Sequence, residues 1–361
     1  MPNLLYTDKT SCCGCGACQF VCPVKAIRLK ADEEGFYYPA VDEQRCISCN
    51  KCREICPAHQ ALKPAEVSRY YALRCQDDTL LQQSTSGGAF SLLAQYVLKK
   101  GGLACGAVYD KNFQVTHRLD TNIAPMRKSK YVQSSLATCF PEIKEALSQQ
   151  RTVLFSGTPC QCHAVKTCFP QAPNLLFAAL ICRGVQSPHF WLDYKAYLEK
   201  QGPLSSYCAR AKKKLDNAHT VAYTINNRET TTSYMKDPFC RIYAKEISLR
   251  PSCYACPYCT PDKPFDFTLG DFWGIEKILP QLADGKGTSL VITGTQRACD
   301  IVEQLGPEAQ VTQVPRQSIL QPALLTPAKQ TILRKLFMRD FAQKDSAGRC
   351  DIPLLLKKYG A

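Results

Sequence analysis

Two cysteine arrays near the N-terminus constrain this 361-residue chain more than any other feature of it. The first runs from Cys12 to Pro23 as Cys-x2-Cys-x2-Cys-x3-Cys-Pro, and the second repeats that pattern from Cys46 to Pro57. Each cysteine of the second array follows its counterpart in the first by 34 residues, so the segment is an internal repeat. Eight thiols at fixed short spacings must surround shared ligands, or else pair with one another.

This spacing is the one with which bacterial ferredoxins bind iron–sulfur clusters, and there the fourth cysteine of each array ligates the other cluster. Gly14 and Gly16 let the first array curl tightly. Zinc knuckles and a disulfide knot are the alternatives, and two complete arrays with both prolines disfavour them. Cys13 is expected to be a small buried or loop residue. We predict two [4Fe-4S] clusters, one held by Cys12, Cys15, Cys18 and Cys56, the other by Cys46, Cys49, Cys52 and Cys22.

The overall composition agrees with metal or redox chemistry. The chain has 23 cysteines, an odd number, with 45% apolar and 21% charged residues, whereas disulfide scaffolds are usually shorter than about 80 residues. The N-terminus shows no signal-peptide pattern. The longest apolar run, residues 175–182, is much shorter than the roughly 20 residues of a membrane span. We therefore expect a cytoplasmic protein without a membrane span, in a reducing compartment.

The formal net charge of +14 suits solubility, an anionic cofactor or a negatively charged electron-transfer partner. Lysine and arginine are scattered, apart from the run Lys212-Lys213-Lys214, which is expected to be a solvated turn. No clustered basic and aromatic surface is evident, so nucleic acid is not an expected partner.

Beyond the arrays, strand-like and helix-like segments alternate. Predicted strands cover residues 69–75, 103–109, 152–155, 175–182 and 289–293, and residues 203–234 look β-rich. Predicted helices cover residues 90–99, 139–149, 161–168, 189–200 and 326–343. We predict an α/β (mixed α+β) fold, in which a small ferredoxin-like domain precedes a domain with a largely parallel sheet covered on both faces.

Three further motifs are individually weaker. Ser86-Gly87-Gly88 opens a helix, whose amides could hold a phosphate or could simply start an ordinary helix. Gly157-Thr158 ends a strand just before Cys160, where α/β sheets bind ligands. The triple Cys253-x2-Cys256-x2-Cys259 could begin a zinc ribbon or a third iron–sulfur site.

Six segments, in order, resemble the beta-subunit family of coenzyme F420 hydrogenases and dehydrogenases. They are Thr85–Phe90, Lys130–Ser134, Phe155–Gln161, Ile181–Pro188, Arg250–Cys256 and Leu269–Gly274. The resemblance covers about residues 70–320. It implies three parts: residues 1–62 as a ferredoxin-type domain, 63–145 as a flavin-binding region, and 146–361 as a region holding a third cluster and the flavin pocket.

The resemblance also implies FAD and a third [4Fe-4S] cluster, the latter held by Cys160, Cys182, Cys253 and Cys256. Cys162 and Cys259 are extra or alternative ligands. Residues matched to the flavin are Ser86, Gly87, Gly88, Lys130, Tyr131, Gln133, Gly157 and Thr158. Asp271 is a candidate for the flavin pocket or a helix N-cap. Arg183 and Gln186 depart from the residues common in the family and leave the acceptor open.

We therefore predict an iron–sulfur flavoprotein oxidoreductase. Electrons would pass from a ferredoxin-like donor, or a hydrogenase- or dehydrogenase-type partner, through the clusters to FAD. A small-molecule acceptor, for which a deazaflavin coenzyme is one candidate, would receive them. The alternative is a non-catalytic electron-transfer subunit or adaptor of a larger redox complex. The sequence assigns no catalytic acid or base, and it leaves homo-oligomer formation open.

Overall fold

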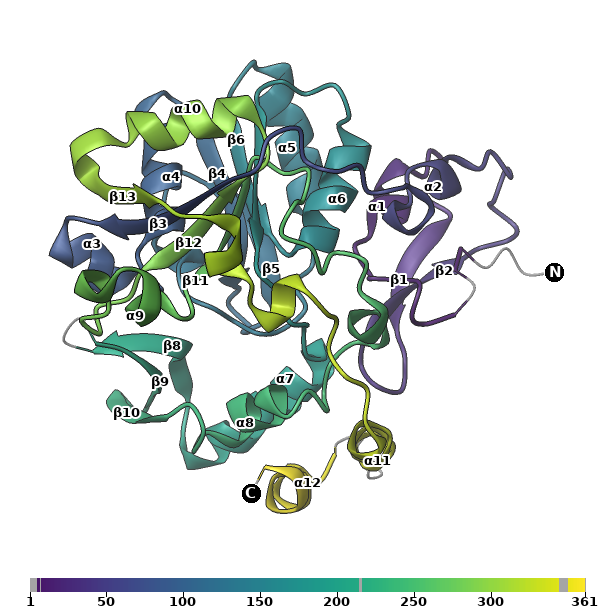
Figure 1. Ribbon diagram of the computed structural model, residues 1–361. Helices are drawn as coiled ribbons and strands as arrows, with labels where there is room; N and C mark the ends of the chain where they lie inside the picture. Colours follow the sequence, from purple (N-terminus) through teal and green to yellow (C-terminus); the bar gives the residue numbers. More distant parts are fainter. Residues whose placement is uncertain (1–4, 7, 214–215, 344–349, 361) are drawn as a thin grey trace.

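The N-terminal residues form a small module in this computed structural model, which describes residues 5–6, 8–213, 216–343 and 350–360. The module contains α1 (Ala17–Val21), β1 (Ile27–Ala31), β2 (Tyr37–Val41) and α2 (Lys51–Glu54). Strands β1 and β2 pair antiparallel, with Ile27 opposite Val41. The predicted hairpin between the two cysteine arrays is thereby confirmed, and each short helix lies within one array (Figure 1).

A large sheet of eight strands forms the centre of the rest of the chain, in the order β13-β3-β12-β11-β7-β6-β4-β5. Its strands are β3 (Arg69–Cys75), β4 (Leu103–Tyr109), β5 (Val115–Asp120), β6 (Val153–Gly157), β7 (Leu175–Leu180), β11 (Phe267–Asp271), β12 (Ser289–Thr293) and β13 (Ala309–Gln313). The four central strands β4, β6, β7 and β11 are parallel to one another. The flanking pairs are antiparallel. The predicted α/β fold is confirmed as a mixed sheet with a parallel centre.

Helices cover both faces of this sheet because successive strand residues point to opposite sides. Leu154 and Leu176 pack on one face with α4 (Ala89–Lys99) and α10 (Gln296–Gln304). Phe155 and Phe177 pack on the other face with α5 (Cys139–Ser148) and α6 (Pro159–Cys168). Figure 1 shows α4 and α10 on one side of the sheet and α5 and α6 beside the N-terminal module. Two short helices, α3 (Asp78–Gln83) and α9 (Ile275–Ile278), lie at the end of the sheet near β3 and β11.

A second, three-stranded antiparallel sheet lies below the large one in Figure 1. It contains β8 (Leu204–Lys213), β9 (Asp216–Ile225) and β10 (Arg228–Ser233). Its apolar face packs on four helices, α7 (Pro188–Leu198), α8 (Pro238–Ala244), α11 (Ile332–Ala342) and α12 (Ile352–Tyr359). Trp191 and Phe239 are fully buried there, so this aromatic core is separate from the two cores that flank the large sheet.

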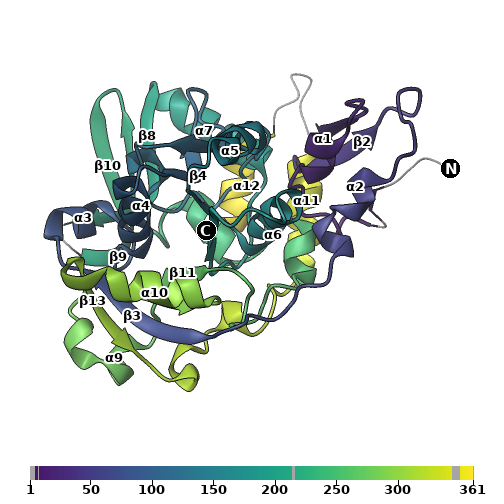
Figure 2. The ribbon, with the colours of Figure 1, turned by 90° about the horizontal axis from the view of Figure 1, so that it is seen from above.

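The N-terminal module docks on both parts of the chain. Phe20 of α1 stacks on Phe140 of α5, with ring centroids 4.9 Å apart. Phe36 and Tyr38 join the aromatic core beneath the small sheet. Figure 2 shows the module at one end of the molecule, beside α6 and α11. The large sheet takes strands from both predicted segments, 63–145 and 146–361, so the boundary between these two segments remains a prediction.

Candidate functional site

The cysteine set farthest from the large sheet lines a cavity. Cys22, Cys46, Cys49 and Cys52 border about 500 Å³ of empty space, part of it open to solvent, with apolar side chains such as Leu5 and Ile27 around them. Burial, followed by the nearby thiols of Cys49 and Cys22, raises the pKa of Cys52. The backbone amide of Ala26 also donates a hydrogen bond to the Cys22 sulfur at 3.2 Å. The fourth cysteine of the first array therefore lies with the second array, as an exchanged ligand requires.

The other predicted set gathers at the start of α1. Burial, and then the thiols of Cys12 and Cys56, raise the pKa of Cys18 to about 12. The pKa of Cys56 is likewise raised by burial and by Cys12, and Cys15 lies within electrostatic range of Cys18 and Cys12. The four thiols fit one shared cluster, because each would be held as an anion in a site where water is scarce.

The third predicted set comes from three separate parts of the chain. Cys160 lies in the first turn of α6, Cys182 follows β7, and Cys253 and Cys256 lie in and beside the 3₁₀ turn Pro251–Ala255. The Cys182 thiol is within electrostatic range of Cys253, Cys160 and Cys259. The structure thus brings the four predicted ligands together, with Cys259 as a fifth thiol hydrogen-bonded to Cys256.

The two extra cysteines differ in their surroundings. Cys162 is fully buried among apolar side chains, and its thiol donates to the carbonyl of Gly157 at 3.7 Å. Cys259 is partly exposed, and its hydrogen bond with Cys256 lowers its pKa to about 7. Among the described residues, no group of three or more His, Cys, Asp or Glu side chains is gathered closely enough for one metal ion. By comparison, a single zinc ion holds its sulfurs about 2.3 Å from one point.

Cys13 connects the first and third sets. Its thiol contacts Cys15 on one side and Cys160 on the other, and the hydrogen bond with Cys15 is the largest of the effects that raise its pKa. The expectation of a loop position is met, but the residue is also a contact between two modules. The three cysteine sets consequently form one line, from the exposed Cys49 inward to Cys182.

Gly157 and Thr158 act at the start of α6. Thr158 caps the helix in a reciprocal capping box with Gln161, and its hydroxyl lies 3.2 Å from the Cys160 sulfur. A Cβ on Gly157 would lie 2.9 Å from the Phe155 ring. Both residues were predicted beside the flavin, and the structure uses them to place Cys160.

Lys130 and Gln133 were also predicted beside the flavin, and the structure uses them for internal contacts. The Lys130 amine donates to the carbonyls of Pro125 and Arg127 at 2.8 and 2.9 Å, and burial lowers its pKa to about 7. The Gln133 side chain donates to the Gly14 carbonyl at 3.2 Å. It therefore contacts the N-terminal module.

The Ser86-Gly87-Gly88 loop is pinned against the edges of β3 and β12. Ser86 donates to the carbonyl of Thr288 at 2.6 Å. The Gly87 amide donates to the Ser289 hydroxyl at 3.0 Å. Gly88, with φ of +83°, precedes the first turn of α4. The loop starts a helix as predicted, and its position is fixed by the sheet.

A buried polar group lies beside this loop. Arg210 of β8 donates to the Asp271 carboxylate at the end of β11 at 3.0 Å, and to the Tyr131 hydroxyl at 3.4 Å. Within the described part of the chain, three of its buried polar atoms have no hydrogen-bond partner: Arg210 Nη2, Asp271 Oδ1 and Thr85 Oγ1. Unpaired buried donors and acceptors are costly, so this group suits a polar ligand. Asp271 is thus in a pocket-like position, and it does not cap a helix.

Lys212 was part of a run predicted to be a solvated turn, and this prediction is wrong for Lys212. The side chain is 4% exposed, and its amine donates to the carbonyls of Leu81, Ser86 and Lys286 at 3.1, 2.6 and 2.8 Å. The reason is strand alternation in β8, because Lys212 points inward and Lys213 outward. Lys214 lies outside the described residues. The sequence analysis also missed Arg210, which the same alternation within β8 could have indicated.

Tyrosines connect the third cysteine set to the Arg210–Asp271 pair. The Tyr243 hydroxyl donates to the carbonyl of Gly184, two residues after Cys182, at 3.3 Å. The Tyr243 and Tyr131 rings have centroids 4.5 Å apart, and Tyr131 contacts Arg210. The polar pair therefore continues the line of cysteine sets.

Two cross-arranged cysteine sets in a hairpin module define an iron–sulfur protein of the two-cluster type, and residues 11–60 match the 4Fe-4S dicluster domain. Residues 150–317 match the C-terminal part of the coenzyme F420 hydrogenase/dehydrogenase beta subunit, and this part of the chain belongs to that family. Together the two matches relate the chain to iron–sulfur proteins of oxidoreductase-type electron transfer.

One similar solved structure is a chain of the F420-reducing [NiFe] hydrogenase complex from Methanosarcina barkeri, in a study of its xenon derivative. The two chains are 18% identical, with a TM-score of 0.47, and the similarity covers 76% of this chain and 88% of that one. No curated protein matches the chain. None of the described helices has both the length and the apolar character needed to cross a membrane.

Proposed function

We propose that this chain is an FAD-dependent iron–sulfur oxidoreductase. Electrons enter at the exposed cysteine set, pass the Cys12 set and a third [4Fe-4S] cluster, and reach FAD beside Arg210 and Asp271. The third cluster is held by Cys160, Cys182 and Cys253, with Cys256 or Cys259 as the fourth ligand. The observation that carries the proposal is the contact of Cys13 with both Cys15 and Cys160, because it joins the ferredoxin module to the third set without a gap.

When bound, the clusters supply single-electron transfer, and FAD supplies the exchange between single electrons and a two-electron acceptor. Two one-electron oxidations of the donor provide both electrons, and the acceptor takes up a proton from the solvent. The protein's own part is to fix the distances, the potentials and the access of water.

The outer cysteine set is suited to meet a donor. Cys49 is exposed, and Ile47 beside it is 60% exposed. An apolar side chain next to an accessible cluster favours brief contact with another redox protein. We infer a ferredoxin-like donor or a hydrogenase- or dehydrogenase-type partner subunit.

The Arg210 site fits an anionic ligand with polar edges. Arg210 and Lys212 are both buried, and Asp271 is the one carboxylate paired with them. The free hydrogen-bonding atoms of Arg210, Asp271 and Thr85 could hold the polar edge of a flavin. The glycine-rich start of α4 could accept its pyrophosphate. Tyr131, Tyr234 and Tyr243 pack together behind this site and exclude water from it.

The test is anaerobic purification followed by iron, sulfide, zinc and flavin analysis. The proposal requires about twelve irons and about one FAD per chain, because each of three clusters holds four irons. Cys160→Ser should reduce the iron to about eight and leave the N-terminal clusters. Eight irons with stoichiometric zinc would remove the third cluster from the proposal. Absence of flavin after reconstitution would refute the enzyme and leave an electron-transfer subunit.

A deazaflavin coenzyme is the acceptor that the matched family favours. Reduction of this coenzyme by the loaded protein, with a low-potential one-electron donor present, is the corresponding assay. A protein with all three clusters and FAD that reduces other acceptors but not the deazaflavin would retain the relay and lose this acceptor.

A further inference from the structure

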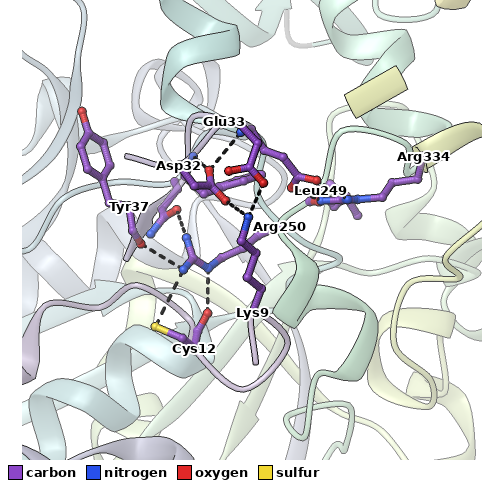
Figure 3. Close-up of polar contacts among 11 residues, drawn as sticks. Lys9, Cys12, Asp32, Glu33, Tyr37, Leu249, Arg250 and Arg334 are labelled. Atoms are coloured by element: carbon purple, nitrogen blue, oxygen red, sulfur yellow. Dashed lines mark hydrogen bonds and ion pairs between the residues drawn. The ribbon is translucent and has the colours of Figure 1, made fainter. Parts of the chain in front are cut away.

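Arg250 lies buried where the ferredoxin module meets the rest of the chain. Its side chain is 1% exposed. Nε donates to the carbonyl of Cys12 at 2.9 Å, and Nη2 donates to the carbonyl of Tyr37 at 3.0 Å. Nη1 donates to the side-chain oxygen of Gln133 at 2.8 Å. Figure 3 shows the guanidinium between the backbone of Cys12 and that of Tyr37. Two of these three bonds therefore cross to the module.

The positive charge of Arg250 has no counter-ion in the described part of the chain. All three of its oxygen acceptors are neutral, and no described carboxylate forms an ion pair with it. The ring of Tyr38, 4.2 Å from the guanidinium carbon, provides only a weak cation–π attraction. Burying an unpaired charge is expensive, so an anionic group is expected close to this side chain.

Arg334 provides the contrast. It is also buried, and it also reaches the module, where Nη1 donates to the Glu34 carboxylate at 2.7 Å. The charge of Arg334 is therefore compensated by a residue of the chain, and that of Arg250 is not. A need to dock the module does not by itself explain why the second arginine lacks a carboxylate.

The predicted cluster ligands lie on both sides of Arg250. Nη2 is 3.9 Å from the Cys12 sulfur. The field of Arg250 also reaches Cys160 and Cys253 of the third set, and Cys253 follows it by three residues in the sequence. A [4Fe-4S] cluster with four cysteinates is a net anion, so each set would supply negative charge near the guanidinium.

We propose that Arg250 is a positioning residue that acts as the shared counter-cation of the Cys12-set cluster and the third cluster. Its fixed charge favours the reduced, more negative state of both clusters and so raises their reduction potentials. Its bonds to Cys12 and Tyr37 hold the two clusters in register. The inference rests on the ligand sets of the proposed function.

The test is a potentiometric titration of the full chain, reconstituted anaerobically and followed by electron paramagnetic resonance. In Arg250→Gln, we expect the equilibrium constant for one-electron reduction of the nearby clusters to fall at least tenfold, which corresponds to about 59 mV. Arg250→Lys keeps the charge and should remain within threefold of wild type. The outer cluster, held by Cys22 and the second array, is the internal reference and should not shift.

Two further variants make the result decisive. Gln133→Glu places a carboxylate on Nη1 without removing the arginine, and it should lower the same constant even if Arg250→Gln fails to fold. The double variant Glu34→Gln with Arg334→Gln removes a neutral ion pair at the same junction and should leave the constant unchanged. The inference is overturned if iron-loaded Arg250→Gln or Gln133→Glu titrates as wild type, or if the lysine and glutamine variants shift equally. A wild-type chain without the third cluster would instead refute the proposed function.

Discussion

Substitution of Gly87 by alanine tests whether the predicted flavin loop is fixed by the sheet. An added Cβ would lie 2.2 Å from the carbonyl oxygen of Leu73 and 2.5 Å from the amide nitrogen of Ser289. Both atoms belong to the backbone of strands, so neither can swing aside. The loop would have to move by about 1 Å, since ordinary contacts begin near 3.2–3.4 Å.

The cost can be estimated from the bonds that this movement breaks. The Gly87 carbonyl accepts from the amide of Cys75 at 2.8 Å, and the Gly87 amide donates to the Ser289 hydroxyl at 3.0 Å. Each such bond contributes about 1 kcal/mol, and overpacking adds about 1–3 kcal/mol. We expect Gly87→Ala to lower the free energy of unfolding by about 3–5 kcal/mol, and the apparent Tm by at least about 5 °C.

The assay is thermal unfolding of the anaerobically loaded protein, with FAD content measured on the same samples. Gly101→Ala is the matched control, because Gly101 has φ of +76° and nothing lies within 4 Å of its added Cβ. The strain there should cost only about 1 kcal/mol. Because the loop also positions Ser86 beside Lys212, Gly87→Ala should retain less flavin than Gly101→Ala. Equal melting temperatures for the two variants would refute the reasoning.

Three further variants test the site and the docking of the module. Cys256→Ser and Cys259→Ser should differ, because loss of the true fourth ligand reduces the iron from about twelve to about eight per chain; full iron in both variants would contradict the third ligand set. Arg210→Met leaves the Asp271 carboxylate buried without its partner, so it should destabilise the protein by about 3–5 kcal/mol and abolish flavin retention, whereas the exposed Lys213→Met should change stability by less than about 1 kcal/mol. Wild-type flavin content in Arg210→Met would place the flavin elsewhere. Phe20→Ala removes a ring stacked on Phe140, should cost about 2 kcal/mol, and should speed amide hydrogen exchange in α1; unchanged protection there would show that the module is held by other contacts.

The sequence predicted elements well where the local pattern was strong. The strands at residues 69–75, 103–109 and 289–293 match β3, β4 and β12, and the helix at 90–99 matches α4. Strands β5 and β13 were missed because they lie at the two edges of the sheet and carry polar residues, as in Val115–Asp120. Their extended conformation comes from pairing with β4 and β3, which is not visible in a short window of sequence.

The candidate site was predicted less completely than the cysteine sets. Motif resemblance selected Lys130 and Gln133, and the structure gives them internal contacts instead. Arg210 and Lys212 were not selected, because in the sequence they precede a lysine run and look like exposed residues. Their burial depends on the small sheet lying against the loop after α3, and that packing joins residues more than 100 positions apart.

The sequence by itself determined the two N-terminal cysteine sets, because all their ligands lie within 45 residues of one another at spacings that fit a single cluster geometry. It also determined the alternating α/β pattern, because hydrophobic periodicity is a local property. Only the tertiary structure decided that Cys13 meets Cys160, that Arg250 lies between two cysteine sets, and that Arg210 faces Asp271. These contacts depend on strand order and on the docking of the module, and neither is encoded in the spacing of neighbouring residues.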